Sequence, residues 1–185
     1  ELPSLDEAAR PTLRVGAAIC HVLEPLGVIR GHGDAAEKYA KGEAGSDAQG
    51  DALGLSIHVR AGHQVRLRLG FGDKDGFDAL ARWRAAYADG ALGGGLVYAI
   101  RDALLRCRRL GVDPPVVAQE VRRVLVAARE RGGTDAIDKS MIVAIETRAA
   151  TLATRHPTEA LWRLTDELII ARWLSANTAA DVGRR

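Results

Sequence analysis

Residues 55–69 carry the pattern that most restricts the fold of this chain, an alternation of apolar and polar side chains in two short runs. Apolar residues occupy every second position from Leu55 to Val59, and again from Val65 to Leu69. A period of two is typical of strands that bury one face, and a short break between two such runs indicates a turn. The sequence therefore predicts a β-hairpin.

The loop length sets the register of this hairpin. A three-residue loop over 60–62 keeps the apolar side chains on one face and puts Gly62 where a left-handed residue is needed, whereas a two-residue loop would mix apolar and polar side chains. The predicted pairs are Val59 with His63, Ile57 with Val65, and Leu55 with Leu67. The outer face then consists of Ser56, His58, Gln64, Arg66 and Arg68, with Arg60 at the tip.

Most of the remaining chain has helical periodicity. A capping box at Ser4–Glu7 and apolar residues at helical spacing predict a first helix, mainly from Thr12 to about Leu23, that ends at Pro25. Five more helices are expected: from Asp75 or Asp78 to Gly90, from about Leu92 to Leu110, from Asp113 to Gly132, from Thr134 or Asp135 to the break at His156-Pro157, and from Thr158 to about Ser175. The predicted fold is mainly α, a bundle of about six helices with one β-hairpin inserted after the first helix.

The domain organisation follows from the glycines. Six of them interrupt residues 31–54, where only 35–41 form a weak helical island. A connection this long is typical of a linker, a mobile functional loop or a disordered insertion. We therefore expect an N-terminal helix over 1–30, a Gly-rich mobile connection over 31–54, the hairpin and bundle over 55–175 in one domain with 1–30, and a tail over 176–185. The last helix is apolar on nearly every side, so it is either central to the bundle or covered by a partner.

The net charge of +2 hides an uneven distribution. Residues 1–54 carry five basic and nine acidic side chains, whereas residues 101–131 carry eight basic and four acidic ones. Arginines of the hairpin and the central helices could together neutralise phosphates; the residues expected to bind nucleic acid are Arg60, Arg66, Arg68, Arg101, Arg108, Arg109, Arg122 and Arg123. Asp102 and Glu120 stand four and three positions before Arg106 and Arg123, spacings at which helix-surface ion pairs form.

The arginines also carry a compositional signal. Of the 26 basic residues 22 are Arg, and this skew, with many Ala and Gly, is typical of GC-rich bacterial genomes. The apolar runs fall short of the roughly 18–20 residues of a membrane-spanning helix. We therefore expect a cytoplasmic bacterial protein with no membrane partner.

No motif identifies catalysis, a metal or a cofactor. The five histidines are not spaced as a metal site on a helix, and the two cysteines, Cys20 and Cys107, lack the paired spacing of a zinc site and read as buried small side chains. Gly93-Gly94-Gly95 could bind an anion at a helix start, but it matches no nucleotide-binding fingerprint. We assign no catalytic residue; the best single candidate is His32, which lies between two glycines and near Asp34.

The sequence therefore favours a non-enzymatic assembly or regulatory subunit that acts through contacts with a protein partner or with further copies of itself. Its last helix and its hairpin are the candidate surfaces. One alternative is a helical subunit that binds nucleic acid through the arginine-rich hairpin and central helices. The other is an enzyme with a site near the 31–54 loop.

Overall fold

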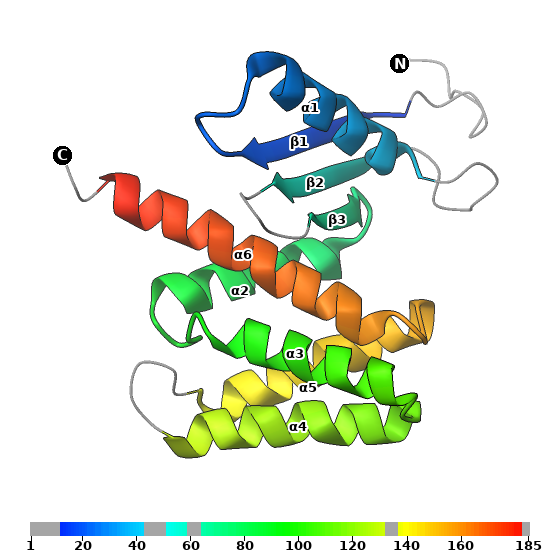
Figure 1. The fold of residues 1–185 in the computed structure, drawn as a ribbon, viewed down its shortest axis with the longest axis vertical. Helices are drawn as coiled ribbons and strands as arrows, with labels where there is room; N and C mark the ends of the chain where they lie inside the picture. Colours follow the sequence, from blue (N-terminus) through cyan, green and yellow to red (C-terminus); the bar gives the residue numbers. More distant parts are fainter. Residues whose placement is uncertain (1–11, 43–50, 59–63, 132–136, 183–185) are drawn as a thin grey trace, which may run out of the picture. The chain divides into compact units, whose positions relative to one another are not determined.

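A computed structural model describes residues 12–42, 51–58, 64–131 and 137–182 (Figure 1). Its fold is mainly α, with six helices and a three-stranded sheet among these residues. The chain divides into two compact units, an N-terminal unit of residues 1–76 and a helical unit of residues 77–185. None of the described helices is long and apolar enough to cross a membrane.

The N-terminal unit is a small mixed sheet with one helix. Its elements are β1 (Arg14–Cys20), α1 (Leu26–Lys41), β2 (Ala52–His58) and β3 (Val65–Gly70), and the strand order is β1-β2-β3. β1 pairs with β2 in parallel, and β2 pairs with β3 in antiparallel. Since parallel neighbours need a crossover, α1 connects β1 to β2, and Figure 1 shows it lying along the sheet.

The prediction of a helix over 12–23 is wrong. Residues 14–20 form β1, and all seven of them pair with β2, from Arg14 beside Ala52 to Cys20 beside His58. Apolar side chains at 13, 17, 20 and 23 fit one helical face, but backbone pairing with a distant strand overrides so weak a local pattern. The expected mobile connection is also wrong over residues 31–41, which belong to α1. The helical island predicted at 35–41 is the end of that helix, and residues 43–50 lie outside the described part.

Two glycines allow α1 to lie directly on the sheet. A Cβ atom added to Gly16 would stand 2.2 Å from the backbone nitrogen of Glu37, and one added to Gly54 would stand 2.4 Å from the carbonyl oxygen of Ala36. Both distances are far shorter than van der Waals contact. The buried residues of α1 are Ala36 and Ala40, so glycine and alanine alone fill the interface at this end of the helix.

The antiparallel pair confirms the predicted register where it is described. Ile57 pairs with Val65 and Leu55 with Leu67. The third predicted pair, Val59 with His63, and the loop over 60–62 lie outside the described residues. The pair is part of a three-stranded sheet, however, and not an isolated hairpin. The face expected to be open to solvent is the one that α1 covers, and Ser56 on this face is only 1% exposed.

The helical unit contains the remaining helices, close to the predicted positions except at the C-terminal end. They are α2 (Lys74–Ala88), which starts just before the boundary, α3 (Leu96–Leu110), α4 (Pro114–Arg131), α5 (Lys139–Arg155) and α6 (Ala160–Val182). The last helix continues beyond the predicted end at about Ser175, so residues 176–182 belong to this helix and not to a tail. Within the unit α3 packs against α4 and α6, and α5 packs against α6. The apolar faces predicted for the central helices are buried, including Ile100 and Leu104 of α3 and Leu125 of α4.

The last helix carries a buried ion pair. Arg148 of α5 donates two hydrogen bonds to Glu167 of α6, from Nε to Oε2 at 3.1 Å and from Nη2 to Oε1 at 2.6 Å. Both side chains are almost fully buried. A bidentate pair of this kind satisfies two charges that would otherwise be costly to bury. Around it the apolar side chains of α6 are buried too, so α6 is central to the helical unit.

Candidate functional site

Three arginines of the helical unit predicted to bind nucleic acid have acidic partners. Arg101 lies 2.7 Å from Asp166, and Arg122 lies 3.3 Å from Glu146, both distances being between a guanidinium nitrogen and a carboxylate oxygen. The third, Arg123, makes two hydrogen bonds of 2.7 Å to Glu120. A carboxylate at each of these positions offsets the positive charge that a phosphate would meet.

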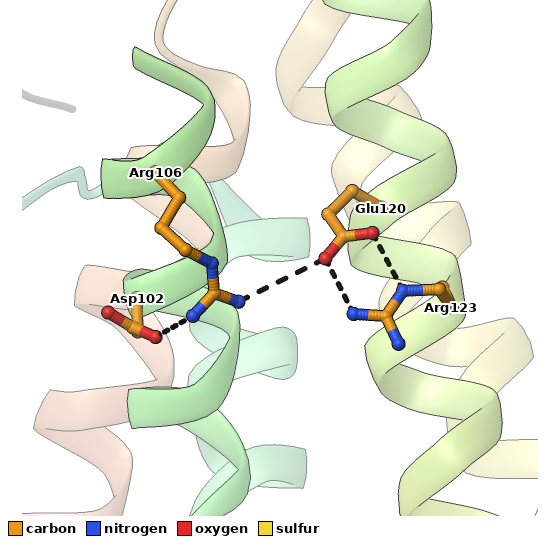
Figure 2. A network of polar contacts seen from close by, with 4 residues as sticks. All are labelled: Asp102, Arg106, Glu120 and Arg123. Carbon is orange, nitrogen blue, oxygen red and sulfur yellow. Dashed lines mark hydrogen bonds and ion pairs between the residues drawn. The ribbon is translucent and has the colours of Figure 1, made fainter. Parts of the chain in front are cut away.

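Figure 2 shows that the pair of Arg123 with Glu120 is part of a network between α3 and α4. Arg106 of α3 forms an ion pair with Asp102 one turn earlier and reaches Glu120 of α4 at 4.0 Å. Glu120 in turn accepts the hydrogen bonds from Arg123, which lower the pKa of its carboxyl group, as do the charges of Arg123 and Arg106. The predicted pairs at spacings of four and three are confirmed. The network joins two helices and is a structural feature of this surface.

Arg108 and Arg109 differ from the others. They lie exposed in the last turn of α3 and have no acidic partner among the described residues. Cations in this position also offset the negative end of the helix dipole.

The hairpin arginines lie in the N-terminal unit. Arg60 is outside the described residues, the Arg66 guanidinium lies 5.1 Å from the centre of the Tyr39 ring, and Arg68 donates from Nε to the carbonyl oxygen of Ala40 at 3.0 Å. Arg68 therefore helps to hold the end of α1 on the sheet. Binding of nucleic acid by these eight residues stays a prediction.

The helical unit contains an apolar groove of about 670 Å³. Buried side chains form its floor, among them Leu104 and Cys107 of α3, Leu125 of α4 and Ile145 of α5. Exposed residues such as Ala118 and Ala150 line its opening. Its volume lies within the roughly 300–1,000 Å³ typical of ligand sites.

Small side chains give the groove its shape. α5 contributes three alanines to the lining, Ala149, Ala150 and Ala153. Alanine on an exposed helix face gives no sequence signal of a site, because it is common on any helix surface. The charged residues in the lining are Arg108 and the ion pair of Arg122 with Glu146. No sequence pattern predicted this groove, although Arg108 and Arg122 were among the functional candidates.

The connection between α3 and α4 also contributes to the groove. Val112 in this connection and Pro114, the first residue of α4, both line it. Nearby in sequence, Leu110 is 78% exposed and Val116 is 48% exposed, but neither lines the groove.

A second cluster lies where β1 and β2 end in the N-terminal unit. The ring of His32 in α1 stacks on the ring of His58 in β2, with centroids 3.6 Å apart and planes 20° from parallel. The Nε2 atom of His58 lies 3.1 Å from the hydroxyl oxygen of Ser56 and 3.3 Å from the amide nitrogen of Gln64. The sequence pointed to His32 but placed His58 on an open surface, because nothing local showed that α1 covers it.

Cys20 of β1 pairs with His58 of β2 and is partly exposed. Both cysteines were expected to be buried, but only Cys107 is. Burial and the nearby Glu24 raise the pKa of the Cys20 thiol, so the thiol stays protonated at neutral pH. Stacked imidazoles hold their lone pairs in two parallel planes, which do not converge on one ion. In the part of the chain that the structure describes, no three His, Cys, Asp or Glu side chains are placed to hold a metal.

Comparisons with protein-family models, with curated proteins and with solved structures found no match to this chain. Its candidate function therefore rests on the groove, the arginines and the imidazole cluster.

Proposed function

We propose that the protein is a non-enzymatic subunit that acts through protein–protein contacts, and that the groove of the helical unit binds an amphipathic helix of its partner. The observation that carries this proposal is an open, mainly apolar groove that four helices line. Recognition of a helix in a groove uses apolar anchors spaced at three, four and seven residues.

The lining supports a helix more than a compact small molecule. Alanines at 149, 150 and 153 allow a partner backbone to come close to α5. Arg108 at the groove has no acidic partner among the described residues, so the partner helix is expected to carry an acidic side chain opposite it.

Peptide display with the purified full chain tests this proposal. Libraries of helical peptides are selected on the native protein, and the enriched peptides are measured against Ala150→Arg, which places a long charged side chain at the groove opening. The matched control is Val143→Arg in the same helix, since Val143 is 52% exposed and does not line the groove. We expect apolar residues at helical spacing in the enriched peptides, at least about a tenfold loss of affinity in Ala150→Arg, and little change in the control.

Two results would overturn the proposal. One is a selection whose peptides bind both variants equally. The other is a selection that enriches no peptide while the native protein binds a small apolar dye that Ala150→Arg does not bind. This result would identify the groove as a site for small apolar ligands.

A further inference from the structure

The two halves of α1 are held on the sheet in different ways. The second half carries both buried alanines, Ala36 and Ala40, and packs directly on the glycines of β1 and β2. It is also tied by the hydrogen bond from Arg68 to the Ala40 carbonyl group and by the ion pair of Arg14 with Glu37 at 3.9 Å. This half is a close-packed interface.

The first half of α1 has no fully buried side chain. Leu26 is 80% exposed, Val28 is also exposed, and Ile29 is half-buried. Gly27, Gly31 and Gly33 have open space where a Cβ atom would stand, so no close packing requires them. Glycines inside a helix also lower its intrinsic stability. The docking of residues 26–33 on the sheet therefore depends strongly on any specific contact between this segment and the sheet.

The stack of His32 on His58 supplies such a contact. His32 stands one helical turn before Ala36, which itself stands one turn before Ala40, so the three residues share the face of α1 that meets the sheet. The hydrogen-bond contacts of His58 with Ser56 and Gln64 fix the orientation of its ring. The Gln64 amide nitrogen can only donate, so its contact with His58 Nε2 requires this nitrogen to be unprotonated, as in a neutral ring.

The groups around the pair do not favour a positive charge. Among the described residues, Cys20 of β1 is paired with His58. The charged side chains that act on His58 are Arg66 of β3 and Glu24, which lies in the connection before α1. Burial lowers the pKa of His58 most, the charges of His32 and Arg66 lower it further, and Glu24 offsets only part of this. Release of residues 26–33 would separate the two rings and restore water to His58.

We propose that His32 and His58 form an acid-sensitive catch, which holds residues 26–33 on the sheet while the His58 ring is neutral and releases them when that ring is protonated. The sign follows from proton binding. Because the docked state takes up a proton on His58 less readily than the released state does, acidification through the ordinary histidine range shifts the equilibrium towards release. Release uncovers Ser56 and the ends of β1 and β2, while the second half of α1 stays docked.

Hydrogen exchange of the full chain at pH 7.5 and pH 5.0 tests the catch. Protection factors, corrected for the pH dependence of intrinsic exchange, are compared for amides of residues 29–35 and of residues 37–41. We expect the protection of 29–35 to fall at least about tenfold at pH 5.0, equivalent to 1.4 kcal/mol of docking free energy, and that of 37–41 to change much less. In His32→Phe, which keeps a ring to stack but removes its charge, this loss should be reduced.

A control and a second measurement complete the test. His156 also has a lowered pKa, because of burial and the nearby Arg163, but it lies in the helical unit, so His156→Gln should leave the response of α1 unchanged. In the native chain, the NMR titration midpoint of the His58 ring should coincide with the midpoint of the protection loss. Equal protection at both pH values, an undiminished loss in folded His32→Phe, or midpoints that differ by more than about one pH unit would overturn the proposal.

Discussion

Replacing Gly54 by alanine should destabilise the N-terminal unit, because β2 meets α1 at this residue without space for a side chain. The added Cβ atom would lie 2.4 Å from the Ala36 carbonyl oxygen and 2.9 Å from the Ala40 backbone nitrogen. Carbon and oxygen normally approach to about 3.3–3.6 Å, so α1 would have to retreat by roughly 1 Å. Overpacking of this kind costs about 1–3 kcal/mol.

The same substitution at Gly31 should have the opposite effect. Gly31 lies in the exposed first half of α1 and has nothing within 4 Å of an added Cβ atom. Alanine in the interior of a helix is more stable than glycine by roughly 0.5–1 kcal/mol. The two variants therefore make an identical chemical change within one unit, and we expect free-energy changes of opposite sign.

The assay must report on the N-terminal unit itself. All three tryptophans, at 83, 162 and 173, lie in the helical unit, so their fluorescence follows that unit alone. Hydrogen exchange of peptides from β1, α1 and β2 in the full chain, measured in increasing urea, gives the local free energy of unfolding. A neutral Gly54→Ala would refute the close packing of α1 on the sheet, and a destabilising Gly31→Ala would refute the open space beside the first half of this helix.

Three further predictions concern the helical unit and the arginines. Glu167→Gln should lower the free energy of unfolding by about 3–5 kcal/mol, because it leaves Arg148 buried without its counter-charge; tryptophan fluorescence in urea measures this, and a loss similar to that of the exposed variant Glu159→Gln would contradict it. The buried Tyr87 hydroxyl has no hydrogen-bond partner among the described residues, so Tyr87→Phe should leave the free energy of unfolding unchanged or raise it by up to about 1 kcal/mol. Tyr98→Phe loses the 3.2 Å hydrogen bond from Arg172, so it should be neither neutral nor stabilising. If the chain binds nucleic acid, its affinity for nucleic acid should fall steeply as the salt concentration rises. The double variant Arg108→Ala with Arg109→Ala should reduce the slope of log affinity against log salt by about 0.9 for each phosphate that it no longer neutralises. Fluorescence anisotropy measures this binding, and binding that does not depend on salt would exclude the function.

Much of the helical unit could be predicted from sequence. Glycines and prolines mark the ends of α2 to α5 and the break before α6, and apolar residues at helical spacing identify buried positions such as Ile100, Leu125 and Leu164. The spacing of Asp102 and Arg106 likewise predicts an ion pair that forms within one helix. These signals are local, since each depends on residues within one or two turns of the same helix.

The candidate sites could be predicted only in part. Arg108 and Arg122 were identified by charge, but the groove beside them depends on alanines whose placement between helices no local pattern shows. His32 was identified by its flanking glycines, whereas its partner His58 was expected to face solvent. The buried pair of Arg148 and Glu167 joins residues 19 positions apart on two helices, and neither residue has a neighbour in sequence that points to it.

By itself, then, the sequence determined the helices of the second unit and the register between Leu55 and Leu67, because periodicity and turn chemistry act over a few residues. Only the tertiary structure decided that residues 14–20 form a strand, that α1 covers the polar face of β2 and β3, and that His32 meets His58. The physical reason is that a parallel strand finds its hydrogen-bond partners far along the chain. At the start of β1 the Leu13 amide donates to the Asp51 carboxylate, 38 positions away, and a helical spacing of apolar side chains cannot outweigh such pairing.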